Sequence, residues 1–463
     1  MNIGNYHFFE YEKSALVYDY VNNILYSPKS IESFYQLQTF LQDYSLGNRT
    51  NFDMLSKYSV FIENYINDVK IFNSSEYINE ISTVSSKITL MISQDCNLRC
   101  SYCYGSEGKF GSEGGLMTNG VAEKTMRYFV NRAKPFGFKY MFITFLGGEP
   151  LMNFPLMRHI IEFNKSEFPE ITFSYTVTTN LTLLTKEMVD YLKNQDISIL
   201  ISLDGYKEIH DKNRVFKNGT GSFDLVLEKI NLLKSNQVLF SIRSTLSHED
   251  FKYYEQVVSF FEELGAQQTF ISRLSNYDIT STKFDINVDE LERDISTVNI
   301  FHDKTHKRIL DGENPIYVPF MKMFERIHEA NESLISCGLL KGSTAVSIDG
   351  FLYPCHRFVG IEGFNFGSIH DGVNPDLVKQ IADNLDKVTT GCSTCWAKFL
   401  CKRGCVRDIA KEGGRFISYD GKFCDLMQKS VEKALVTYFN IVKLRPDYLK
   451  EFSHKEIEIY NVV

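Results

Sequence analysis

Three cysteines lie close together in the segment SQDCNLRCSYCYG, residues 93–105. Cys96, Cys100 and Cys103 follow the apolar run KITLMIS (87–93), which predicts a buried strand, so the thiols should lie on the loop at its carboxyl end. A closed zinc site needs four ligands, and no fourth Cys or His is nearby in the sequence. Three thiolates can hold an iron–sulfur cubane and leave its fourth iron without a protein ligand. The spacing therefore favours a cluster with one open coordination position.

Seven further cysteines lie toward the carboxyl end, and none falls between residues 104 and 336. In a reducing compartment, cysteines grouped in this way are more often metal ligands or nucleophiles than disulfide partners. The local C-x2-C spacing is also typical of zinc ribbons, so zinc stays an alternative on spacing alone. The sequence predicts a second cysteine site, separate from the first, at Cys337, Cys355, Cys392, Cys395, Cys401, Cys405 and Cys424.

The segments between about 87 and 274 must position the first site, and they alternate strand-like with helical patterns. Strand then helix, repeated, predicts parallel pairing with right-handed crossovers. Six such units are too few for a closed eight-stranded barrel, so a partial barrel and an open doubly wound sheet both fit. In either form the functional residues should gather at the carboxyl ends of the strands. The expected strands are 87–93, 140–146, 171–177, 198–204, 239–246 and 268–274.

The pattern C-x3-C-x2-C with Tyr102 before its last cysteine resembles the signature of the radical S-adenosylmethionine (SAM) superfamily. The resemblance implies an α/β fold with a partial (β/α)6 barrel, and a catalytic [4Fe–4S] cluster on Cys96, Cys100 and Cys103 whose open iron binds SAM. Motifs at the later strand ends, LGGEP, TTN and SLDG, fit the same family. The implied cofactor-binding residues are Tyr102, Gly147, Gly148, Glu149, Asn180, Ser202, Asp204 and Arg243.

The order of the seven later cysteines, including G-x4-C at Gly350 and Cys355, resembles the SPASM domain of radical SAM enzymes. That resemblance implies two auxiliary [4Fe–4S] clusters, and so three clusters in all. Two cubanes need eight ligands, so the eighth is a substrate group, His356 or water. We hypothesise a substrate thiolate, a natural ligand for iron. The resemblance assigns one cluster to Cys392, Cys395, Cys401 and Cys424, and the other to Cys337, Cys355 and Cys405.

The first 85 residues have a different pattern. HFFEYEK and ALVYDYV predict a hairpin, Ser27-Pro28 leads into a helix with Ile31, Phe34, Leu37 and Leu41 on one face, and a second helix is expected at about 53–68. We interpret this part as a small winged-helix-like domain, with a helical lid as the alternative. The predicted domains are a leader-peptide recognition domain (1–85), a radical SAM partial barrel (86–280), a helical bridge (281–336) and a SPASM domain (337–463).

SPASM enzymes mostly act on peptides or proteins, and two subclasses compete here. Sulfatase-maturating enzymes, which make formylglycine, resemble the chain at SLDG and at Lys207–His210. They generally carry Asp directly after the cysteine of G-x4-C, where this chain has His356. Maturases of ribosomally made peptides resemble it better, because they frequently begin with a winged-helix domain that binds the precursor's leader by strand addition. We predict thioether formation of the sactionine or ranthipeptide type.

Composition limits the other function classes. A net charge of -8 and the lack of a long Lys/Arg block argue against nucleic acid as a partner. The amino-terminal segment lacks a signal-peptide pattern and no apolar run reaches membrane-spanning length, so we expect a cytoplasmic protein without a membrane partner. The resemblance implies a flavodoxin or ferredoxin as electron donor. The alternative from another class is a zinc-stapled scaffold that presents peptides without catalysis.

Overall fold

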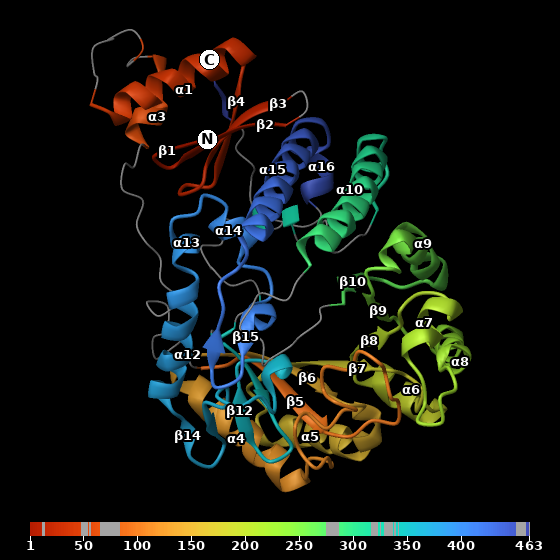
Figure 1. The fold of residues 1–463 in the computed structure, drawn as a ribbon. Helices are drawn as coiled ribbons and strands as arrows, with labels where there is room; N and C mark the ends of the chain where they lie inside the picture. Colours follow the sequence, from red (N-terminus) through yellow and green to blue (C-terminus); the bar gives the residue numbers. More distant parts are fainter. Residues whose placement is uncertain are drawn as a thin grey trace.

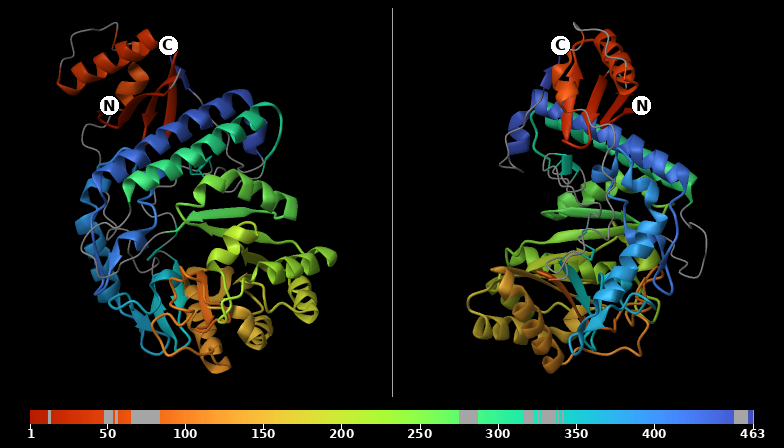
Figure 2. Two further views of the ribbon diagram at one scale, coloured as in Figure 1. Left: turned by 45° about the vertical axis from the view of Figure 1, so that its right-hand side comes forward. Right: turned by 90° about the vertical axis from the view of Figure 1, so that its left-hand side faces the viewer.

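The computed structural model shows three layers along the long dimension of the molecule: an amino-terminal sheet, a pair of long helices and a barrel. Figure 1 places an amino-terminal sheet unit at one end and a larger barrel unit at the other. Helices α10 (Val288–Leu310) and α15 (Gly421–Leu444) lie side by side between them, as Figure 1 and Figure 2 show. The structure describes residues 1–11, 14–47, 54, 57–64, 84–274, 287–315, 323–324, 326–327, 337, 339–340, 342–450 and 460–462.

The barrel unit contains six parallel strands that neighbour one another in chain order. This order has no reversal, and a doubly wound sheet needs one, so the partial-barrel form is the one observed. Its strands are β5 (Lys87–Ser93), β6 (Tyr140–Gly147), β7 (Thr172–Thr179), β8 (Ser198–Ser202), β9 (Ser241–Leu246) and β10 (Thr269–Arg273). The boundaries of these strands lie within two residues of the expected ones, and the predicted α/β fold is confirmed.

Helices connect these strands and lie on the outer side of the curved sheet (Figure 1). They are amphipathic: in the first, buried Ala122, Met126, Phe129 and Val130 recur at helical spacing, and the Thr118 side chain caps the amino end by accepting from the Val121 N–H. The helices are α4 (Asn119–Ala133), α5 (Phe154–Glu167), α6 (Lys186–Asn194), α7 (Lys207–Asn213), α8 (Phe223–Ser235) and α9 (Tyr254–Leu264), with short 3-10 turns η3 (Lys134–Phe136), η4 (Pro150–Asn153) and η5 (Phe251–Tyr253).

A hairpin that turns at Asp349-Gly350 extends the barrel sheet. β11 (Ser343–Val346) pairs in parallel with β5, and β12 (Phe351–Tyr353) returns antiparallel to it. β13 (Gly367–Ser368) and β14 (Gly372–Val373) continue the same sheet. β5 is the first barrel strand, and β11 covers its open edge by pairing with it. The barrel sheet therefore includes strands beyond residue 280, where the predicted division ends the barrel.

The amino-terminal unit has the predicted hairpin, formed by β2 (Tyr6–Tyr11) and β3 (Ser14–Asp19). The sheet also contains β1 (Asn2–Ile3), β4 (Ile24–Pro28) and, from the opposite end of the chain, β17 (Tyr460–Val462). The last strand runs parallel to β4. The predicted division placed all of 337–463 in the cysteine-rich domain, whereas its last strand covers the edge of this sheet. Such pairing is nonlocal and has no sequence signature.

Helix α1 (Ile31–Ser45) begins after a Ser30 cap and buries Phe34, Leu37 and Leu41, as expected. Ile31, in the first turn, is half exposed instead. Of the second predicted helix, the structure describes α3 (Ser59–Glu63) and a buried Tyr58, and the remaining residues of that prediction lie outside the described ones.

Both faces of the amino-terminal sheet are buried. Tyr6 and Phe8 pack in a local core with α1, while Phe9 and Leu16 pack in the main core together with the cysteine-rich region. Alternation along β2 therefore directs one set of side chains to each side. Because the sheet packs into the main core, it is fixed to the rest of the molecule.

The cysteine-rich region consists of short elements connected by loops. They are η6 (His356–Phe358), α12 (Pro375–Val388), α13 (Thr390–Ser393), α14 (Lys398–Cys401), η7 (Val406–Ile409), β15 (Ala410–Lys411) and β16 (Arg415–Phe416), with α16 (Pro446–Lys450) after α15. Of the predicted helical bridge (281–336), the structure describes α10, and much of the remainder lies outside the described residues. Among the described helices, none combines the length and apolar character needed to span a bilayer.

Candidate active site

Cys96, Cys100 and Cys103 line one cavity of about 210 Å³ at the carboxyl ends of the barrel strands, as their spacing predicts. The Leu98 N–H donates to Cys96 Sγ at 3.4 Å, and Asn180 Nδ2 lies 3.8 Å from the same sulfur. Burial and the nearby Glu149 carboxylate raise the pKa of Cys96 to about 12. Because metal ligation requires the thiolate, a bound cationic cluster would displace this proton.

The GGEP turn holds the backbone of the cysteine loop. The N–H groups of Gly148 and Glu149 donate to the carbonyls of Ser93 and Asp95 at 2.8 and 2.9 Å. A Cβ on Gly147 would lie 1.9 Å from the Ser93 oxygen, so glycine is required for this approach. Gly147 and Gly148 also line the cavity, as the SAM-site prediction requires.

Glu149 does not line the cavity, although the sequence suggested that it contacts the cofactor. Its side chain is fully buried and accepts from the Leu151 N–H, the Thr179 hydroxyl and the Asn180 N–H at 2.9, 2.6 and 2.7 Å. Burial raises the pKa of Glu149 to about 7 despite these bonds. The carboxylate therefore positions the TTN turn, whose Asn180 does line the cavity.

Asp204 likewise lies behind the cavity wall and is completely buried. Its Oδ2 accepts from Arg214 Nε at 2.8 Å and from the Tyr102 hydroxyl, and its Oδ1 accepts from the Thr245 N–H at 2.9 Å. The Arg214 guanidinium also lies over the Tyr102 ring, 5.5 Å from its centroid. Asp204 thus fixes the aromatic residue of the cysteine motif to the end of β8, and its oxygens are occupied by protein donors.

Ser202 and Arg243 lie where the sequence suggested, in the cavity lining at the ends of β8 and within β9. No carboxylate pairs with Arg243 in the part of the chain that the structure describes, so its guanidinium is available to an anionic group in the cavity. Sequence reasoning did not single out Arg214, Thr245, Arg273 or Arg357, which also line it. Arg214 lies one helical turn after His210, the last residue of the Lys207–His210 segment. This spacing was the sequence signal that could have identified Arg214 as a residue of the site.

The pKa values of the later thiols indicate which of them lie near one another. Burial, with contributions from the nearby Cys337 and Cys405, raises the pKa of Cys355 to about 12. Burial raises the pKa of Cys401 to about 12 as well, with contributions from Cys395, Cys392 and Cys424. These mutual effects relate Cys355 to Cys337 and Cys405, here called the three-thiol group, and Cys401 to Cys392, Cys395 and Cys424, here called the four-thiol group.

The three-thiol group adjoins the cavity that Cys96, Cys100 and Cys103 line, which we call the central cavity. Cys355 is followed directly by His356 and Arg357, and both of these line the cavity. Arg357 Nη1 lies 3.1 Å from Cys405 Sγ, so this side chain contacts the thiol group and the cavity at once. Burial and the Arg243 charge lower the pKa of His356 to about 3, which places this imidazole beside Arg243.

The donor sets fit iron–sulfur clusters better than single metal ions. Within the described residues, no three His, Cys, Asp or Glu side chains converge closely enough to bind one ion. A tetrahedral zinc site requires such convergence, with Zn–S distances of about 2.3 Å. N–H groups donate to Cys96, Cys395 and Cys405 sulfurs, a contact that also tunes cluster potentials.

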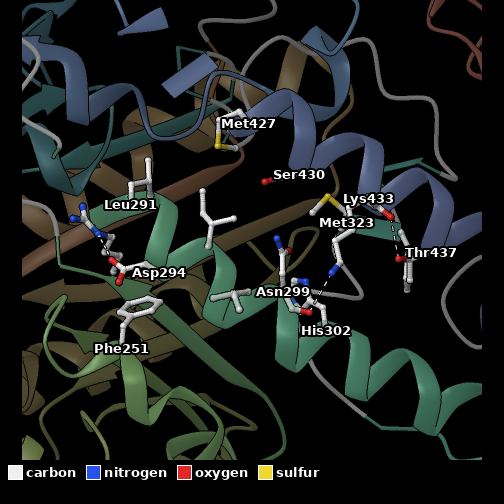
Figure 3. A pocket seen from close by; sticks show the side chains of 15 residues that line it. Phe251, Leu291, Asp294, Asn299, His302, Met323, Met427, Ser430, Lys433 and Thr437 are labelled. Carbon is white, nitrogen blue, oxygen red and sulfur yellow. Dashed lines mark hydrogen bonds and ion pairs between the residues drawn. The ribbon is translucent and has the colours of Figure 1, made fainter. Parts of the chain in front are cut away.

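A second cavity of about 240 Å³ lies between η5, α10 and α15 (Figure 3). Most of its lining is apolar, and the Arg273–Asp294 ion pair (2.6 Å) lies at one end while Lys433 lies toward the other. Arg273 lines both cavities, so the two adjoin at this side chain. The described lining of the second cavity contains no thiol, and we therefore place the chemistry in the first.

Comparisons with known proteins agree with this geometry. The radical SAM superfamily model matches residues 90–261. The cysteine-type anaerobic sulfatase-maturating enzyme of Clostridium novyi (strain NT) is 26% identical over 356 residues, which cover 74% of this chain and 92% of the relative. Residues 90–261 are therefore a radical SAM domain, which implies a [4Fe–4S] cluster and SAM.

Two solved structures are similar in fold to most of this chain. Native anSMEcpe with bound AdoMet aligns with a TM-score of 0.64 and 22% identity over 77% of this chain and 99% of that chain. Streptococcus suis SuiB bound to precursor peptide SuiA aligns with a TM-score of 0.52 and 15% identity over 90% of this chain and 98% of that chain. At these identities the likeness is one of fold.

Proposed function

We propose that this protein is a radical SAM peptide maturase that joins a cysteine sulfur to a carbon of another residue in a ribosomally made precursor peptide. The observation that carries the proposal is the three-thiol group of Cys337, Cys355 and Cys405, which adjoins the central cavity through His356 and Arg357. A cluster held there by three cysteines would have a position for a substrate thiolate, next to the cavity where the radical SAM domain would hold SAM.

The residues of this chain have separate tasks in the proposed reaction. When bound, SAM and its cluster would supply a deoxyadenosyl radical, which removes a hydrogen atom from a substrate carbon. The auxiliary clusters would supply a site for the substrate sulfur and an acceptor for the surplus electron. Gly147, Gly148, Asn180 and Ser202, which line the cavity, would contact SAM, and Arg243 would pair with its carboxylate. Asp204 and Glu149 hold the loops that carry these side chains.

The amino-terminal sheet is the proposed binding site for the leader of the precursor peptide. An extended peptide adds to a sheet edge through backbone hydrogen bonds. Support comes from SuiB, which aligns over nearly the entire length of this chain and has been solved with a precursor peptide. A flavodoxin or ferredoxin would supply electrons, and we place the protein in the cytoplasm, where thiols stay reduced.

Coexpression tests this function. The chain should be produced anaerobically with a small cysteine-containing open reading frame encoded beside its gene, and the peptide mass measured. We expect a loss of two hydrogen atoms for each crosslink, together with protection of the cysteine from alkylation. An unmodified peptide from a preparation with full iron content would contradict the proposal. The variant C96A/C100A/C103A is the control and should leave the peptide unchanged.

Formylglycine formation is a second candidate, because a curated sulfatase-maturating enzyme matches 74% of this chain. The same mass measurement separates the two, since an aldehyde at the cysteine reacts with hydrazides and a thioether does not. The sequence difference at His356, where those enzymes generally carry Asp, favours the thioether product.

A further inference from the structure

The amino-terminal sheet contacts the four-thiol group through His7. His7 lies on β2, and its ring stacks on the Trp396 ring with centroids 3.5 Å apart and planes 6° apart. Both side chains are buried, at 5% and 3% exposure. Trp396 directly follows Cys395 and is the only tryptophan of the chain. One aromatic contact thus joins the proposed recognition domain to a residue beside a proposed cluster ligand.

Hydrogen bonds continue from this stack to the sulfur. Trp396 Nε1 donates to Gln428 Oε1 at 3.2 Å, and Gln428 Nε2 donates to Cys395 Sγ at 3.7 Å. His7 Nε2 lies 2.8 Å from Glu432 Oε1. Gln428 and Glu432 are four residues apart on α15, so the same face of one helix holds both ends of the network.

A second contact from the same sheet reaches Cys395. Tyr20 follows β3 directly, and its ring lies 5.8 Å from the Lys398 ammonium. Burial raises the pKa of Tyr20, with smaller contributions from Asp19 and from Cys395, which therefore lies near the phenol. Asn2 on the edge strand β1 lies 2.6 Å from His7 Nδ1. The contact between sheet and thiol group therefore involves both the edge and the interior of the sheet.

We propose that His7 is a positioning residue: it holds Trp396 in place and, through Gln428, sets the hydrogen bond to the Cys395 sulfur. Hydrogen bonds to ligand sulfurs stabilise the reduced state of an iron–sulfur cluster and raise its reduction potential. The inference rests on the proposed assignment of Cys395 as a cluster ligand. It gives the amino-terminal sheet a route by which its conformation influences the four-thiol cluster.

The test compares the full chain with four variants, each reconstituted anaerobically and titrated by EPR against a series of redox mediators. Q428L removes the N–H donor to Cys395, and H7A removes the stacked ring. H7F keeps a ring against Trp396 but loses the polar contacts to Glu432 and Asn2. Y35F is the matched control, because it removes a hydrogen bond to Glu10 on the same domain, away from Trp396.

We expect Q428L and H7A to shift the potential of one auxiliary cluster to more negative values, with H7F and Y35F close to wild type. Emission from Trp396 provides a second readout that needs no iron, and it should shift to longer wavelength in H7A alone. An unchanged potential and emission in H7A would overturn the inference even if Q428L shifts the potential. Iron and sulfide analysis separates a failure of this inference from a failure of the cluster assignment. If wild type lacks the iron of this cluster and C392A lowers the iron content no further, the cluster assignment is overturned as well.

Discussion

At the scale of single residues, Asp204 secures the cysteine motif to the barrel. Its carboxylate is buried and pairs with Arg214, whose side chain is 12% exposed. We expect D204N to lower the free energy of unfolding by about 3–5 kcal/mol, because the Arg214 charge would stay buried without a counter-charge. Urea denaturation of the apoprotein measures this. The control D224N disrupts an exposed pair with Lys207 and should cost less than about 1 kcal/mol; equal losses would contradict the account.

His210 gives the barrel a predictable pH dependence. Its ring is buried, with Nδ1 accepting from the Asp204 N–H and Nε2 beside the Ser222 hydroxyl. Burial, aided by the Arg214 charge, lowers the pKa of His210 from 6.5 to about 4. The unfolded chain therefore takes up this proton first, so stability is complete above about pH 6.5 and falls as the pH drops toward 4, by up to about 3 kcal/mol.

The matched variant for this dependence is H210N, which cannot take up the proton. Urea midpoints at pH 7.5 and pH 5 should show a smaller decline in the variant than in wild type. His302 and His356 are lowered in pKa in the same direction, so part of the decline should persist. Identical declines in both proteins would show that His210 is not the group responsible.

At the scale of elements, the approach of the GGEP turn to the cysteine loop sets the site. G147A would place a methyl group 1.9 Å from the Ser93 oxygen and displace the loop that leads to Cys96. We expect loss of SAM-dependent spectral changes with auxiliary iron retained. G137A is the control, because Gly137 also has a positive φ (72°) but has no atom within 4 Å of its added Cβ. Equal behaviour of the two variants would mean that backbone strain, rather than close approach, causes the effect.

Local sequence predicted the barrel strands because each is a short run of β-branched and aromatic residues between helical segments. It did not predict the pairing of β11 with β5 or of β17 with β4, since an open strand edge carries no residue pattern that names its partner. The same limit applies to side-chain roles. Motif position put Glu149 and Asp204 in the cofactor site, whereas their buried oxygens are occupied by protein donors.

At the scale of the whole molecule, three units bring their functional residues to one region. The radical SAM domain supplies the central cavity, the cysteine-rich region adjoins it through His356 and Arg357, and the amino-terminal sheet packs onto the four-thiol group through His7 and Trp396. The sequence indicated each unit, and the resemblance indicated the grouping of the thiols. The contacts between units were not predictable, because they join residues hundreds of positions apart.

The most direct test of the central claim is SAM cleavage by the anaerobically reconstituted protein. With dithionite as reductant, we expect wild type to release 5′-deoxyadenosine and methionine. The variant C96A/C100A/C103A should release neither while it retains the iron bound by the seven later cysteines. Wild-type protein with full iron content that leaves SAM intact, or a triple variant that still cleaves it, would contradict the assignment of these three cysteines as the catalytic centre.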